Sequence, residues 1–173
     1  HEALRTSFDT HEGQPIQVTH EQVTFTLERN DVSDVPDAAR MASARALVET
    51  DAECPFDLAT PPLIRARLIR LGDDEHVLAI VMHHVTSDGR SLEVLFEELT
   101  ALYEARRAGR PSPLPALPMQ YVDYAVFERE WLTTPDTERQ VAWWRDALDG
   151  APPLLQLSTD RPRPAVQTFV GDV

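Results

Sequence analysis

The segment "VLAIVMHHVTSDGRS", residues 77–91, constrains the fold of this chain more than any other stretch. An apolar run over residues 77–82 leads directly into His83 and His84, and Asp88 and Gly89 follow a short interval later. Because the run is apolar at every position, it predicts a β-strand that is buried on both faces and central in a sheet. The fold must therefore end a strand, turn, and begin a helix around two imidazole rings.

The residues upstream predict the strands that accompany this one. Residues 63–70 alternate in part between polar and apolar, which predicts a half-exposed strand, and "GDD" predicts the turn that follows it. Further upstream, β-branched residues in partial alternation predict one or two strands within residues 15–28. The solvated face of the half-exposed strand is expected to carry the clustered arginines Arg65, Arg67 and Arg70.

Four helices are expected. Residues 37–53 are alanine-rich and lack Gly and Pro, and Pro36 suits the first turn of a helix there. After the histidines, apolar residues recur at steps of three and four, which predicts one helix with a single apolar stripe. Residues 119–132 and 137–150 predict two more helices. The stripe consists of Leu92, Leu95, Phe96, Leu99, Leu102 and Tyr103, and the helix is expected to end at Arg106, Arg107 and Gly109.

The end of the sequence predicts an extended tail over residues 151–169 and the start of a new strand at residues 169–173. Trp143 and Trp144 are expected to be buried in helix packing, although a stacking platform is the alternative. The order of strand, helix, hairpin, histidine loop and further helices predicts an α/β or α+β layered domain.

Composition limits the classes of function. The chain has 173 residues, enough for one domain or one lobe of a larger one, and we expect it to be a segment of a longer polypeptide. A net charge of −13 would repel a phosphate backbone, so nucleic acid is not an expected partner. No apolar run approaches the ~18 residues of a membrane span and no signal peptide opens the chain, so a cytoplasmic location without membrane contact is expected. The single cysteine, Cys54, excludes an internal disulfide and most thiolate metal sites.

The two histidines should differ in role. Neighbouring side chains on a strand point to opposite faces, so His83 and His84 cannot easily chelate one metal together. No further metal ligand lies at a suitable spacing from Asp88 and the histidines, so no metal site is expected here. One histidine should instead face the core and the other an open surface. The alternative is a pair of core histidines with no chemical role.

The turn from strand to helix suits acyl chemistry. It places backbone N–H groups and a positive helix end beside an imidazole, an arrangement that stabilises a developing oxyanion. Gly89 permits close approach of a ligand, and Asp88 is a candidate for a buried ion pair or a helix cap. Ser87 lacks a nucleophile-elbow pattern. The simplest chemistry is direct transfer, in which one bound substrate attacks another while histidine accepts a proton.

Five segments, taken in order, resemble one family. "HHVTSDG" is similar to the HHxxxDG signature of condensation domains of nonribosomal peptide synthetases, which other acyltransferases of the chloramphenicol acetyltransferase-like superfamily share. "HEALRTSF" resembles the family motif RHExLRTxF without its first arginine. The resemblance continues through "PFDLATPPLIRARLIRL", through "YVDYAVFEREWL" with Phe127 in place of the usual tryptophan, and through "WWRDALDGAPPLLQLSTDRPRP".

The resemblance implies a fold, a reaction and partners. The fold would be a chloramphenicol acetyltransferase-like lobe, a mixed sheet with helices packed on it, and residues 1–173 would be the N-terminal lobe without its C-terminal partner. The reaction would form an amide bond between a donor acyl or peptidyl thioester and an acceptor aminoacyl thioester. Donor and acceptor peptidyl carrier protein domains would bring these on 4′-phosphopantetheine arms, beside an adenylation domain. No cofactor would bind the chain directly.

The resemblance also implies site roles. His84 would be the catalytic histidine and His83 its structural neighbour. Asp88 would be structural, paired with Arg5, and Gly89 would offer its backbone N–H near the reacting carbonyl. Three alternatives remain: an epimerisation domain, a free-standing acyltransferase that uses coenzyme A thioesters, and a degenerate domain that recruits other proteins.

Overall fold

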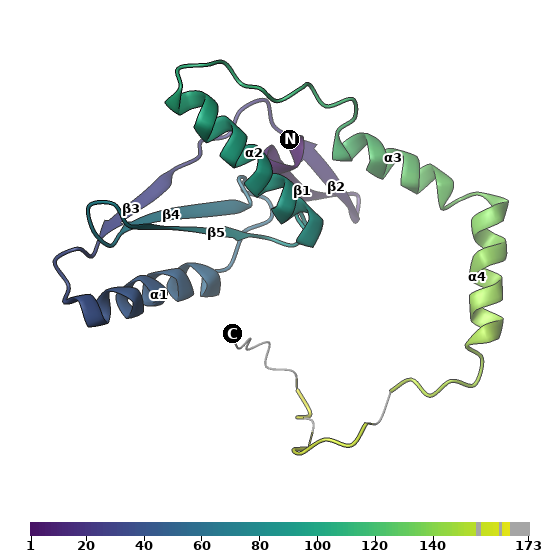
Figure 1. Cartoon of the computed structure of the whole chain (residues 1–173). Coiled ribbons are helices and arrows are strands. Elements are labelled where there is room, and N and C mark those ends of the chain that lie inside the picture. The colour runs from purple at the N-terminus through teal and green to yellow at the C-terminus, as the bar shows by residue number, and fades with distance from the viewer. Residues whose placement is uncertain (155–156, 163, 167–173) are drawn as a thin grey trace. The chain divides into compact units, whose positions relative to one another are not determined.

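The computed structural model describes residues 1–154, 157–162 and 164–166. The chain divides into two units, residues 1–128 and residues 129–173, and Figure 1 labels their helices and strands. The first unit contains every strand of the described residues and the loop that carries the histidines. Helix α3 (Tyr121–Trp131) begins in the first unit, and helix α4 (Pro135–Ala147) lies in the second.

A three-stranded sheet organises the first unit. Its order is β3 (Leu27–Asp31), β4 (Ile64–Arg70), β5 (His76–Met82), with β3 parallel and β5 antiparallel to β4. The sheet is mixed, as expected, but the predicted central position of the apolar strand is wrong: among the described strands, β4 is central and β5 is at an edge. Apolar side chains report how the faces of a strand are covered, and they carry no information about pairing along its edges.

Helix α1 (Asp37–Glu53) packs against this sheet and forms its core. The helix contacts β4 and β5, as Figure 1 shows, and its bounds agree with the predicted range. Ala44 and Ile69 are almost completely buried in this core, and the small alanine side chain permits close approach of the helix. The remaining members of this core are Val32 and Leu71, with Val35, Leu47, Val48 and Val77 packed around them.

A separate two-stranded hairpin follows the short 3₁₀ helix η1 (Glu2–Arg5). Strand β1 (Thr6–His11) pairs antiparallel with β2 (Gln14–Thr19). Glu12 and Gly13 form the two-residue turn with φ angles of 51° and 78°, the positive values that a tight hairpin turn requires. Sequence patterns do not reveal β1, because its residues lack a strong apolar alternation and Glu-Gly is not a common turn pair.

Helix α2 (Gly89–Arg107) follows the histidine loop and leaves much of its apolar stripe uncovered. Gly109, with φ 65°, lies just beyond its end, in agreement with the prediction. Ala105 is buried, but most of the large stripe residues are exposed. The exposed members are Leu92, Phe96, Leu99, Leu102 and Tyr103.

In the second unit, Thr134 caps α4 by accepting a hydrogen bond from the N–H of Thr137. The predicted burial of the tryptophan pair is wrong, because Trp143 and Trp144 are 62% and 56% exposed. Their rings meet edge to face, with ring centroids 4.9 Å apart. The described part of residues 151–166 contains no helix or strand. The strand expected at residues 169–173 lies outside the described residues. No helix in the described ranges is both long and apolar enough to cross a membrane.

Arginines of β4 tie α1 to the sheet rather than lying on a solvated face. Arg67 makes a two-pronged ion pair with Asp51 at 2.6 and 2.7 Å, and the two side chains are 16% and 17% exposed. Arg65 donates to the carbonyl oxygens of Asp51, Cys54 and Pro55, the first two at 2.8 and 2.9 Å. The expected solvated face is therefore wrong for these two arginines, because the C-terminal end of α1 supplies acceptors beside them.

We predict that Asp51→Asn lowers the unfolding free energy by about 2 kcal/mol at pH 7, because it removes a half-buried charge-assisted pair. The hydrogen bonds from Arg67 lower the pKa of Asp51 in the folded protein. The stabilisation is therefore complete above the pKa of the unfolded carboxyl, about 4, and is lost as the pH falls through the lower folded value.

Urea unfolding at several pH values measures this difference, which should narrow below about pH 4. Glu49→Gln, on the exposed side of the same helix, is the matched control and should leave stability unchanged. Equal stability of wild type and Asp51→Asn at pH 7 would contradict the prediction.

Candidate active site

The loop between β5 and α2 is a tight turn held together at one carbonyl oxygen. The oxygen of His83 accepts a hydrogen bond from the N–H of Thr86 at 3.0 Å. The hydroxyls of Thr86 and Ser87 donate to the same oxygen at 3.0 and 3.3 Å. The N–H of His83 itself continues the sheet by donating to Leu63 at 3.1 Å. The chain therefore reverses immediately after the last residue that the sheet holds.

His83 is used for packing. Its Nδ1 lies 3.0 Å from the N–H of Val85, and because that N–H can only donate, Nδ1 must carry a lone pair. The half-buried ring meets Phe56 edge to face, with ring centroids 6.0 Å apart. The guanidinium of Arg65 lies 3.7 Å from the centroid of the same phenylalanine ring. The hydrogen bond from Val85 to Nδ1 and the ring contact with Phe56 therefore give His83 a packing role in the fold.

His84 has the opposite arrangement. Its Nδ1 lies 3.1 Å from the carbonyl oxygen of Ser87, and because a carbonyl can only accept, Nδ1 must carry the hydrogen. In the neutral ring the lone pair is then on Nε2. The side chain is exposed and lines a cavity, which His83 does not. The structure thus makes the two histidines unequal, as alternation along the strand predicts.

The cavity beside His84 has a volume of about 410 Å³, and all of its lining residues belong to the first unit. Met82, Val94 and Leu95 give it an aliphatic wall, from the end of β5 and the start of α2. The rest of the lining comes from η1, the hairpin of β1 and β2, the histidine loop and the start of α3, with Glu2 and Tyr121 among the contributors. This is room for a small substrate group next to an imidazole.

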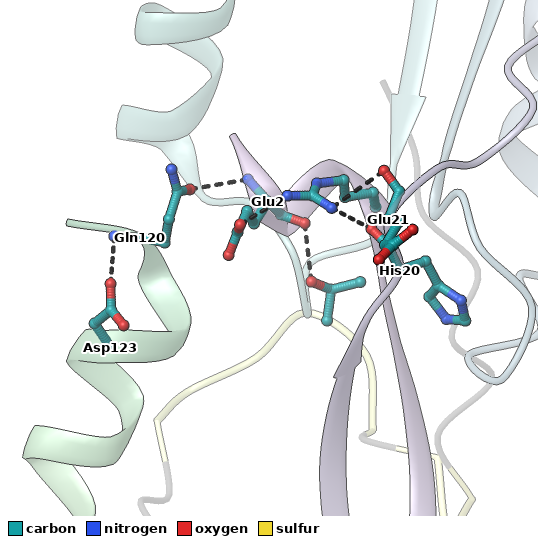
Figure 2. A network of polar contacts seen from close by, with 7 residues as sticks. Glu2, His20, Glu21, Gln120 and Asp123 are labelled. Carbon is teal, nitrogen blue, oxygen red and sulfur yellow. Dashed lines mark hydrogen bonds and ion pairs between the residues drawn. The ribbon is translucent and has the colours of Figure 1, made fainter. Parts of the chain in front are cut away.

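A polar network joins the segments that enclose the cavity (Figure 2). The N–H of Glu2 donates to Oε1 of Gln120 at 3.0 Å, and the N–H of Gln120 donates to the Asp123 carboxylate at 2.8 Å. Together these contacts attach η1 to the first turn of α3. On the other side, Nε2 of His1 lies 3.0 Å from the carboxylate of Glu98 on α2. The sequence does not predict the contacts of Glu2 with Gln120 and of His1 with Glu98, because about a hundred positions separate the partners.

Asp88 caps α2 and does not pair with Arg5. Its carboxylate accepts hydrogen bonds from the hydroxyl and N–H of Ser91 at 2.7 and 2.8 Å, and these bonds lower the pKa of the Asp88 carboxyl. Arg5 instead donates to the Glu2 carboxylate at 2.7 Å and to the carbonyl oxygens of His20 and Glu21 (Figure 2). The predicted Arg5–Asp88 ion pair is therefore wrong in this structure, and the exposed Asp88 takes its alternative role, because both groups find partners nearby in the chain.

Gly89 is the first residue of α2, and it does not line the cavity. A Cβ added there would meet no atom within 4 Å, so neighbouring atoms do not require glycine at this position. Within the described residues, no group of three or more His, Cys, Asp or Glu side chains is arranged to hold a metal ion.

The family model described as "Condensation domain" matches residues 1–173. The chain belongs to the condensation domain family. The predicted α/β lobe with a mixed sheet and helices packed on it is thereby confirmed. The family's HHxxxDG signature is the histidine loop just described.

Relatives of this condensation domain include synthetases and solved domains. Phosphinothricin tripeptide synthetase PhsC of Streptomyces viridochromogenes is 42% identical over 171 residues, which cover 99% of this chain and 16% of that protein. The solved SgcC5 protein of Streptomyces globisporus has a TM-score of 0.74 at 32% identity, over 94% of this chain and 36% of that one. A chain in the solved complex of the X-domain and OxyB from teicoplanin biosynthesis has a TM-score of 0.75 at 34% identity, over 96% and 36%. The chain thus spans a small part of the synthetase and little more than a third of these solved relatives.

We predict that Asp88→Ala lowers the melting temperature of the condensation domain by a few degrees, because the first turn of α2 loses its cap. Asp88→Asn should keep the melting temperature, since asparagine caps helices as well as aspartate does. Arg5→Met combined with Asp88→Ala should show additive changes in thermal unfolding, as expected for residues that do not interact. A loss for Asp88→Asn equal to that for Asp88→Ala, together with non-additivity, would instead support the ion pair.

Proposed function

We propose that this condensation domain forms an amide bond between a donor acyl or peptidyl thioester and an acceptor aminoacyl thioester, with His84 as its catalytic histidine. The observation that carries the proposal is the orientation of His84. Its Nδ1–H is held by Ser87, and its ring lines the cavity with Nε2 free to accept a proton. Both substrates are carried on phosphopantetheine arms of donor and acceptor carrier protein domains, and an adenylation domain loads the acceptor.

The proposed step balances without any further reactant. The amine of the acceptor forms the C–N bond to the donor carbonyl carbon, and the π electrons of the carbonyl move to its oxygen. Nε2 of His84 takes a proton from the nitrogen. The C–S bond then breaks as the carbonyl re-forms, and the departing thiolate receives the proton from His84. The positive N-terminus of α2 reaches the cavity through Arg90 and Ser91 and includes the N–H of Gly89, and we propose that it favours the transient negative oxygen.

The role of His84 includes positioning as well as proton transfer. A free α-amine has a pKa of about 8, so a fair fraction is neutral at pH 7 and can attack without a strong base. A group that holds the amine against the carbonyl lowers the barrier by supplying orientation in advance. His84 is the side chain of the loop placed to do both.

We further propose that residues 1–173 are the N-terminal lobe of the domain and that a second lobe completes the active site. The exposed apolar stripe of α2 supports this, because large uncovered apolar faces are uncommon on soluble monomeric proteins. The open cavity beside His84 supports it as well, since a two-substrate thioester reaction benefits from exclusion of water.

A recruiting domain is the second candidate, and the likeness to the chain in the X-domain complex favours it. Against it, His84, Asp88 and Gly89 are all present in the signature of this chain. An epimerisation domain or a free-standing acyltransferase is distinguished by its product: exchange of the Cα hydrogen with solvent for the first, and acyl transfer from coenzyme A for the second.

We predict that His84→Ala in the complete domain reduces dipeptide formation by about 10²–10⁴-fold, the usual contribution of a positioned acid–base group. The assay supplies two loaded carrier proteins and detects the product by mass spectrometry. His76→Ala, an exposed histidine at the start of β5, is the matched control and should keep wild-type turnover. Near-normal turnover by His84→Ala would remove the assignment.

The chain alone should form no dipeptide, whereas the complete domain should do so under the same conditions, because the second lobe supplies part of the proposed active site. The same loaded carrier proteins serve both arms of the experiment. Condensation by residues 1–173 alone would show that this lobe is sufficient.

A further inference from the structure

The hydroxyls of Thr86 and Ser87 converge on one atom next to the proposed catalytic histidine. Both donate to the carbonyl oxygen of His83, at 3.0 and 3.3 Å, and that oxygen also receives the N–H of Thr86. Both residues are half-buried and line the cavity beside His84. A surface loop needs no such concentration of donors to reverse direction, because the bond from the Thr86 N–H alone closes the turn.

These hydrogen bonds also determine the surroundings of His84. Tying the Thr86 and Ser87 side chains back to His83 fixes the course of the backbone through Ser87. The carbonyl oxygen of Ser87 is the group that accepts the Nδ1–H of His84 at 3.1 Å. In a neutral imidazole, the hydrogen bond made by one nitrogen decides which nitrogen carries the hydrogen. A displaced Ser87 carbonyl would release the ring to the tautomer with hydrogen on Nε2.

We infer that Thr86 and Ser87 are positioning residues that hold His84 in its Nδ1–H tautomer, with the Nε2 lone pair directed to the substrate. The inference rests on the proposed role of His84 in the condensation reaction. With hydrogen on Nε2, the neutral ring cannot take the proton of the attacking amine through that atom. The two hydroxyls thus act through the backbone and not through contact with the substrates.

The geometry ranks the two residues. A carbonyl oxygen has two lone pairs, and the two shorter contacts, both from Thr86 at 3.0 Å, match them. The Ser87 hydroxyl, at 3.3 Å, is the weaker third donor. Removal of the Thr86 hydroxyl should therefore disturb the histidine more than removal of the Ser87 hydroxyl. Thr86→Val is the suitable change, because it keeps the branched shape and removes only the hydroxyl.

The experiment uses the complete condensation domain labelled with ¹⁵N-histidine. Long-range ¹H–¹⁵N correlation spectra at about pH 8.5, where histidine side chains are generally neutral, report which ring nitrogen carries hydrogen. The His84 signals are assigned by their loss in His84→Gln. Wild type should show hydrogen on Nδ1 alone. Thr86→Val should show a mixture of tautomers and a kcat for dipeptide formation reduced on the order of tenfold, with KM unchanged.

Three further variants make the result decisive. Thr86→Ser keeps a hydroxyl and should restore both the single tautomer and the rate. Thr50→Val removes an exposed hydroxyl that donates to the carbonyl oxygen of Ala46 at 2.9 Å on α1, and should change neither readout. Ser87→Ala should give a smaller shift than Thr86→Val.

The inference fails if wild type carries its hydrogen on Nε2, or if Thr86→Val keeps the Nδ1–H tautomer. A change of tautomer without loss of kcat would also overturn it, since His84 would then work in either form. The proposed function fails separately, through an active His84→Ala, and the spectra report on the loop whatever that result is.

Discussion

The register between β4 and β5 is the constraint on which the site depends. Seven residue pairs join the strands, from Arg70 opposite His76 to Ile64 opposite Met82. One more hydrogen bond, from the N–H of His83 to Leu63, ends the ladder. His83 is therefore the last residue that the sheet holds, and His84 is the first that it releases. A slip of one residue would exchange their faces, since side chains along a strand alternate.

The side chains of β4 extend this control to the loop. Arg65 gathers the carbonyl oxygens at the end of α1 and lies against Phe56, which in turn meets the ring of His83. Arg67 holds Asp51 on the same helix. Residues of β4 therefore hold three parts of the first unit in place: helix α1, the segment that carries Phe56, and the histidine loop. The chemistry of His84 depends on this buried support, because the His84 ring keeps a fixed orientation only if His83 is fixed in the fold.

The features that sequence predicted correctly were local ones. The bounds of α1 follow from its composition, and the inequality of the two histidines follows from strand alternation. What failed depended on partners far away in the chain or beyond it. Asp88 had two roles open to it, and the choice of a cap was decided by the nearer partners that Arg5 finds at Glu2 and His20. The position of β5 at an edge, the strand β1, and the exposure of Trp143 and Trp144 likewise depend on neighbours that no periodicity reports.

The edge position of β5 has a consequence for any use of this chain by itself. An edge strand presents a row of unpaired backbone donors and acceptors. Native proteins usually protect such an edge with charged side chains, with proline, or with a helix or loop that covers it. Between His76 and Met82 the strand has only apolar side chains, so no charged side chain there protects its edge. Such a row is the kind of template on which a strand of another molecule can pair. Pairing of β5 with the β5 of a second copy would join two correctly folded molecules through one continuous sheet.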